Sequence, residues 1–169
     1  MRRLFPLVAF ALSAAAQAPF HRAELIFPLE KWHNHASSIV ELPGGELFVC
    51  WYHGSGERQA DDVVIRGARR PRGQTAWGAP FLLADTPGFP DANPALFLDS
   101  RRRLWLFWPV ILANEWHTGL LKYRISSDYR GAGAPRWEVS EDALFIPRNF
   151  EAAVKRTVAG WPPTAHASR

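Results

Sequence analysis

Residues 38–51 read SIVELPGGELFVCW, and residues 95–108 read ALFLDSRRRLWLFW. The two stretches align without a gap at a spacing of 57 positions, which places Trp51 on Trp108. Each stretch is an apolar run, a short polar turn and a second apolar run rich in aromatic residues, which is the pattern of a β-hairpin. The sequence therefore predicts the same hairpin twice.

A second pattern follows each hairpin. Residues 63–66 (VVIR) and 120–125 (LLKYRI) are apolar runs that precede a polar turn and then Trp77 or Trp137, at spacings of 57 to 60 positions. Units of four strands without a helical stretch between them are typical of β-propeller blades. We therefore expect an all-β propeller fold of four-stranded antiparallel blades, with the two tryptophans on the fourth strands. A single β-sandwich is the alternative.

The repeat also sets the expected domain organisation. Blade one covers about residues 32–80 and blade two about residues 93–140, and residues 141–169 form a partial linker in which 151–155 begin a helix or an extended segment. Two blades cannot close a propeller, because each blade packs on two neighbours. We therefore expect the 169 residues to be the N-terminal part of a longer protein.

The first 18 residues have the features of a signal peptide. Arg2 and Arg3 precede a largely apolar stretch over residues 4–15, and residues 16–18 (AQA) supply a small-x-small cleavage pattern. An uncleaved anchor is the alternative, but this apolar stretch is short for a membrane span. We expect a secreted or periplasmic protein with no stable membrane span after cleavage.

Charge and cysteine content narrow the function classes. The formal net charge of +4 includes Arg2 and Arg3, so that 18 basic residues face 16 acidic ones in residues 19–169. This near balance argues against a nucleic-acid partner. Cys50 is the only cysteine, which excludes an intrachain disulfide, and its apolar neighbours predict a buried, inert thiol.

The turn of the second unit carries a recognisable motif. Ser126, Asp128 and Gly131, followed by Trp137, resemble the Asp-box, with a longer spacing than its usual form. With the order of the hairpin and strand segments, this motif makes the chain similar to bacterial sialidase-like (BNR repeat) proteins. The resemblance implies a six-bladed propeller of about 340–400 residues and an exo-acting glycoside hydrolase with a carbohydrate substrate. A non-catalytic propeller that binds a glycan or a protein, and a polysaccharide lyase, are the alternatives.

The resemblance also suggests site residues. His35 stands where sialidases carry the first arginine of the triad that binds the substrate carboxylate, which puts sialic acid specificity in question. The general acid of the family lies on the loop after the second strand, where Glu57 is the first candidate and Asp62 the second. Arg58 and Asn93 are candidate substrate-binding residues.

Other chemistry is not expected. His33 and His35 offer two imidazoles, but the sequence shows no third ligand beside them, so we expect no metal and no cofactor. The tyrosine nucleophile and the later arginines of sialidases belong to later blades, and Tyr52 lies in the wrong segment for this role. We therefore expect the 169-residue chain alone to be inactive.

Overall fold

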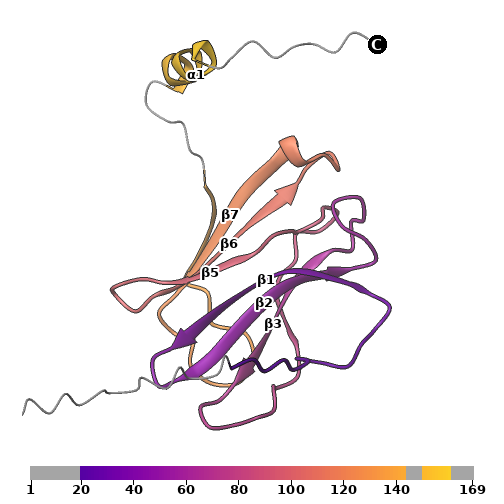
Figure 1. Cartoon of the computed structure of the whole chain (residues 1–169), viewed down its shortest axis with the longest axis vertical. Helices are drawn as coiled ribbons and strands as arrows, with labels where there is room; N and C mark the ends of the chain where they lie inside the picture. Colours follow the sequence, from indigo (N-terminus) through magenta and orange to yellow (C-terminus); the bar gives the residue numbers. More distant parts are fainter. Residues whose placement is uncertain (1–19, 144–149, 161–169) are drawn as a thin grey trace, which may run out of the picture.

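The computed structural model describes residues 20–143 and 150–160 and shows two four-stranded antiparallel sheets (Figure 1). The expected signal peptide, residues 1–18, lies outside the described residues. The strands of the first sheet are β1 His33–Leu42, β2 Glu46–Gly54, β3 Val64–Arg70 and β4 Phe81–Ala84. Those of the second sheet are β5 Ala95–Leu98, β6 Leu104–Ile111, β7 Gly119–Ser126 and β8 Val139–Asp142.

Each sheet is formed by four consecutive strands in sequence order. Immunoglobulin-type sandwiches connect their two sheets by Greek-key crossovers, whereas a propeller blade is a simple meander. The prediction of an all-β fold with about two blades is confirmed. A 3-10 turn η1, Trp116–Thr118, follows β6, and a helix α1, Phe150–Ala159, lies in the predicted linker.

The repeat extends to the backbone of the hairpin turns. In blade one the Gly45 N–H donates to the Leu42 carbonyl at 2.9 Å, and in blade two the Arg102 N–H donates to the Asp99 carbonyl at 2.9 Å. Gly45 has a φ of 85° and Arg102 a φ of 59°, so both turns use a left-handed residue at the same place. The two turns therefore share one hydrogen bond and one left-handed position, which only the first fills with glycine. They differ at the preceding residue, because Gly44 has a φ of 109° and its counterpart Arg101 is not left-handed.

The main hydrophobic core lies between the two blades. Alternate side chains of β2 and β6 face each other across it, as expected for strands with a period of two. The central buried residues of the core are Phe48, Cys50, Tyr52, Leu104, Leu106 and Trp108. At one end of the sheets the β2–β3 loop reaches the β6–β7 loop, where the Asn114 amide donates to the Arg58 carbonyl at 2.8 Å.

The predicted position of the two repeated tryptophans is wrong by a few residues. Trp77 and Trp137 lie in the segments before β4 and β8, not on these strands. Pro80 lies between Trp77 and β4, and a proline has no N–H to donate to the ladder. The fourth strands begin after the two tryptophans and end at Ala84 and Asp142, slightly beyond the expected blade ends at about 80 and 140.

The Asp-box turn follows β7. The Ser126 hydroxyl accepts a hydrogen bond from the Asp128 N–H at 3.0 Å, and Gly131 has a φ of 98°. These are the local side-chain-to-backbone bond and the left-handed glycine that the motif predicts. Trp137 packs against the edge of the main core. The motif is therefore structural here.

Arg69 on β3 connects this turn to blade one. Its guanidinium donates to the carbonyls of Tyr129 and Gly133, each at 2.7 Å, and to the Glu46 carboxylate at 2.5 Å. Arg69 is buried. One side chain thus fixes the Asp-box turn of blade two against the second and third strands of blade one.

The outer faces of the two blades differ. Residues Ile26 and Phe27, which precede β1, cover Val49 and Trp51 on the outer face of blade one, and the rings of Phe27 and Trp51 stack at 5.1 Å.

The described helices include none that is long and apolar enough to cross a membrane.

The outer face of blade two carries an aromatic cluster that has no such cover among residues 20–143 and 150–160. The rings of Trp105, Phe107 and Tyr123 pack against one another at 5.5 to 6.2 Å and remain half-exposed. Phe97, which pairs with Trp105 across β5 and β6, is 55% exposed. Blade two therefore presents an apolar sheet face, here called the aromatic face.

Candidate functional site

A β-bulge at the start of β1 aims two histidines at one face of blade one. His35 pairs with Tyr52 and Ser38 pairs with Cys50, so three steps along β1 correspond to two along β2, and Ala36 in the bulge has a φ of 51°. Strict alternation would place the side chains of His35 and Ser38 on opposite faces. The extra residue brings His35 to the face that points toward blade two.

The hydroxyl of Tyr52 is the centre of the site. Tyr52 is fully buried, and its hydroxyl donates to Glu57 Oε1 at 2.8 Å. The same oxygen lies 2.9 Å from His35 Nδ1 and 3.2 Å from His33 Nε2. A phenol has one proton, which goes to Glu57, so both imidazoles must donate to the oxygen. This requires a proton on His35 Nδ1 and on His33 Nε2.

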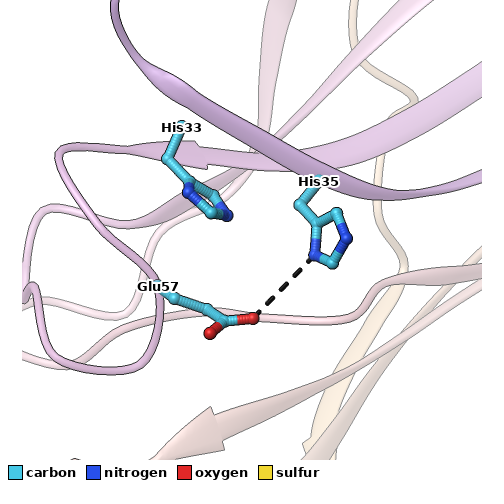
Figure 2. A group of neighbouring side chains, drawn as sticks. All are labelled: His33, His35 and Glu57. Atoms are coloured by element: carbon cyan, nitrogen blue, oxygen red, sulfur yellow. Dashed lines mark ion pairs between the residues drawn. The ribbon is translucent and has the colours of Figure 1, made fainter.

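The three partners of Tyr52 converge from two elements, as Figure 2 shows. His33 and His35 come from β1, and Glu57 comes from the loop between β2 and β3. His35 Nδ1 lies 3.9 Å from Glu57 Oε1, and the two side chains are 65% and 36% exposed. A buried phenol thus supports a cluster that is open to solvent.

Burial keeps the phenol of Tyr52 neutral. Desolvation, followed by the hydrogen bond to the Glu57 carboxylate and its charge, raises the pKa of Tyr52 well above its usual range. All three hydrogen-bonding positions of the hydroxyl are filled. Tyr52 therefore acts as a support for the cluster.

Burial also raises the pKa of Cys50 to about 12, so this thiol is protonated and inert near neutral pH, as expected.

A second network holds the start of β1 from its other face. Asn34 Oδ1 accepts from Trp51 Nε1 at 3.0 Å and from His53 Nδ1 at 2.9 Å, and His53 Nδ1 also lies 3.2 Å from Glu30 Oε1. Burial, and after it the charge of Arg66, lowers the pKa of His53. This network fixes β1 at Asn34, the residue between the two histidines of the cluster.

Three other expected site residues do not join the cluster. Asp62 Oδ1 accepts from the N–H and the hydroxyl of Ser55 at 3.0 and 2.9 Å, which closes the loop that carries Glu57. Asn93 is exposed, has a φ of 43° and makes no hydrogen bond through its amide among the described residues. It lies 57 positions after Ala36, so it takes the same backbone conformation in blade two.

Arg58 turns toward blade two. Its guanidinium lies 5.7 Å from the ring of Trp116 and 4.0 Å from Glu115, while its carbonyl accepts from the Asn114 amide at 2.8 Å. Arg58 therefore joins the β2–β3 loop to the loop that contains η1. The structure thus brings His35 and Glu57 together, and leaves Arg58, Asp62 and Asn93 outside the cluster.

Sequence reasoning missed Tyr52, and it found no third ligand for a metal beside His33 and His35. In the sequence Tyr52 continues the alternation of Phe48 and Cys50, and it therefore reads as an ordinary core residue. The register between β1 and β2, together with the bulge, decides that its hydroxyl meets both histidines.

Comparison with known protein families agrees with this architecture. The family model of the BNR repeat-like domain matches residues 45–154, which is more than half of the chain and includes seven of the eight strands from β2 onward. No curated protein matches the chain. The chain therefore belongs to the BNR repeat-like family.

Proposed function

We propose that the protein is an exported sialidase-like glycoside hydrolase that removes the terminal sugar of a glycan, with Glu57 as its general acid. The observation that carries the proposal is the position of the Glu57 carboxylate, which Tyr52 holds beside His35 at the exposed end of blade one. The BNR repeat-like family supports the sialidase-like class.

One of the two carboxylate oxygens of Glu57 is not occupied by a hydrogen bond among the described residues and can face a substrate. Oε1 accepts from Tyr52, and Oε2 makes no hydrogen bond among the described residues. Oε2 is the atom that would hold the proton for the oxygen of a leaving sugar, and such a positioned acid contributes about 10²–10⁴-fold to the rate. The family's tyrosine nucleophile is not Tyr52, because this phenol is buried and its hydrogen bonds are complete.

His35 is proposed to bind the substrate next to this acid. Its side chain is 65% exposed and lies 3.9 Å from the Glu57 carboxylate. A protonated imidazole pairs with an anionic group of the sugar, although it lacks the two-pronged geometry of an arginine. We expect His35→Ala to raise KM more than it lowers kcat, in steady-state assays on an anionic glycoside.

Replacement of Glu57 tests the proposed acid. In the full-length enzyme Glu57→Gln should lower kcat by about 10² or more on a glycoside with a poor leaving group. An aryl glycoside with a good leaving group should be less affected, since it needs less protonation. Asp61→Asn, in the same loop, is the matched control and should retain wild-type kcat. Wild-type turnover of the poor substrate by Glu57→Gln would rule out this residue as the acid.

Asp62→Asn separates the two carboxylates. Because Asp62 binds Ser55 and closes the loop, its loss should lower thermal stability and raise KM through a looser loop, with a smaller effect on kcat than Glu57→Gln. If Asp62→Asn lowers kcat more than Glu57→Gln does, the acid is Asp62.

A glycan-binding propeller without catalysis is the second candidate. It is favoured by the position of Arg58, whose guanidinium faces Glu115 and Trp116 and not the pair His35 and Glu57. A glycan array distinguishes the two functions. Binding that Glu57→Gln leaves unchanged, with no released sugar, would favour the binding propeller.

Export is part of the proposal. The proposed signal peptide, residues 1–18, predicts a mature chain that begins at Pro19. N-terminal sequencing of the protein recovered from periplasm or medium tests this site, and a chain retained inside the cell with Met1 would contradict export.

A further inference from the structure

We propose that His33, His35 and Glu57 form a binding site for a zinc ion. One potential ligand atom from each of the three residues lies within 4.8 Å of the other two. The two imidazoles come from β1 and the carboxylate comes from the loop between β2 and β3 (Figure 2). The site is a property of these side chains and does not rest on the proposed hydrolysis.

The ligand types suit zinc. Two imidazoles and one carboxylate form a set found in catalytic zinc sites, where a fourth position stays open. Imidazole ligands favour zinc and its transition-metal neighbours over magnesium or calcium. In the sequence the pair His33 and His35 had no third ligand, and the fold supplies it from Glu57.

The distances are close to those that a metal needs. Zinc bonds of about 2.0–2.2 Å in a tetrahedron place neighbouring ligand atoms roughly 3.4 Å apart. His35 Nδ1 and Glu57 Oε1 are already 3.9 Å apart. Both side chains are partly exposed, and Glu57 follows Gly56 in a loop, so small side-chain rotations complete the approach.

Tyr52 arranges the ligands before any metal arrives. Its hydroxyl oxygen lies 2.8 to 3.2 Å from all three side chains, which gathers them in one place. When zinc binds, each imidazole moves its proton to the nitrogen on the far side of the ring, and each ring turns so that the freed lone pair points away from the phenol oxygen and toward the metal. The phenol continues to donate to the Glu57 carboxylate, which is a typical second-shell contact of a zinc ligand.

The local charge also favours a cation. Asp61 and Asp62 lie in the same loop as Glu57. Among the described residues no lysine or arginine pairs with Glu57, and the nearest arginine in sequence, Arg58, faces Glu115. The carboxylate of Glu57 is therefore free of a competing strong cation.

Zinc binding has a consequence for the proposed enzyme. A carboxylate that binds zinc cannot also deliver a proton, so zinc would occupy the proposed acid and inhibit hydrolysis. This makes the two roles of Glu57 mutually exclusive.

Calorimetric titration of the metal-free protein with zinc chloride tests the site. We expect one zinc ion per chain for the wild type, and binding weakened by about 100-fold or more in His33→Ala/His35→Ala, since even second-shell changes cost up to this much. Glu57→Gln should also weaken binding. His117→Ala, which removes an exposed histidine of η1, is the matched control and should bind as the wild type does.

The outcomes separate this proposal from the proposed function. Wild-type protein that binds no zinc, or a double variant that binds it equally well, overturns the site. If the double variant does not fold by circular dichroism, the loop variant Glu57→Gln decides in its place. Zinc binding by a protein that cleaves no glycoside supports the site and counts against the hydrolase, whereas hydrolysis without zinc binding overturns the site alone.

Discussion

At the scale of single residues, one repeated position holds Asn34 in blade one and Asp91 in blade two, and the two side chains have different surroundings. Asn34 and Asp91 are 57 positions apart, and each accepts a hydrogen bond from the indole of the equivalent tryptophan, Trp51 or Trp108. Asp91 is fully buried and also accepts from the N–H and the hydroxyl of Thr86. The blade-one copy borders the candidate site, and the blade-two copy belongs to the core.

This difference predicts a stability effect. Asp91→Asn presents an amide NH₂ to a Thr86 donor, which leaves a buried donor without an acceptor, so the free energy of unfolding should fall by about 1–3 kcal/mol. Asp85→Asn, which changes an exposed carboxylate nearby, should have little effect. Urea denaturation measures both. Equal stability of the Asp91 variant and the wild type would contradict the assigned hydrogen bonds.

Asp91 also predicts a pH dependence. Burial raises the pKa of Asp91 above its usual value, despite its hydrogen bonds, so the folded state binds this proton more tightly than the unfolded state. The corresponding stability is present below about pH 4 and is lost as the pH rises through the raised pKa. The stability difference between the wild type and Asp91→Asn should therefore be largest at acid pH. A difference that grows toward neutral pH would contradict this sign.

At the scale of elements, the strands and turns were predicted from the sequence more accurately than the candidate site was. Alternating apolar residues and the Pro43-Gly44-Gly45 turn predict the first hairpin, and the spacing of 57 carries the prediction to the second. The bulge at Ala36 was not predictable, because no glycine marks its left-handed backbone. Since this bulge aims His35 at Tyr52, the centre of the candidate site was missed with it.

The connection between the blades predicts the effect of losing Arg69. Arg69→Met would leave the Glu46 carboxylate and the carbonyls of Tyr129 and Gly133 without their donor. Loss of one partner of a buried ion pair costs about 3–5 kcal/mol, and the partial exposure of Glu46 places the expected loss near 3 kcal/mol. Arg101→Met, on an exposed turn, is the control. Thermal denaturation in which both variants melt alike would contradict the role of Arg69.

At the scale of the whole molecule, the aromatic face of blade two should control solubility. Trp105, Phe107 and Tyr123 are half-exposed and Phe97 is 55% exposed, and a sheet face of this kind promotes self-association. We expect the 169-residue chain to sediment as oligomers or to precipitate. Phe97→Glu should shift it toward the monomer, whereas Leu112→Glu, at an exposed apolar position in a loop, should not. A monomeric wild type that unfolds cooperatively would contradict this expectation.

The central claim is that the hydroxyl of Tyr52 gathers His33, His35 and Glu57 into one site. Nuclear magnetic resonance of ¹⁵N-labelled histidine in metal-free protein, at a pH where both imidazoles are neutral, tests it most directly. We predict a proton on Nδ1 of His35 and on Nε2 of His33, and loss of the Nδ1–H form of His35 in Tyr52→Phe. Both histidines with the proton on Nε2, unchanged in Tyr52→Phe, would contradict the account.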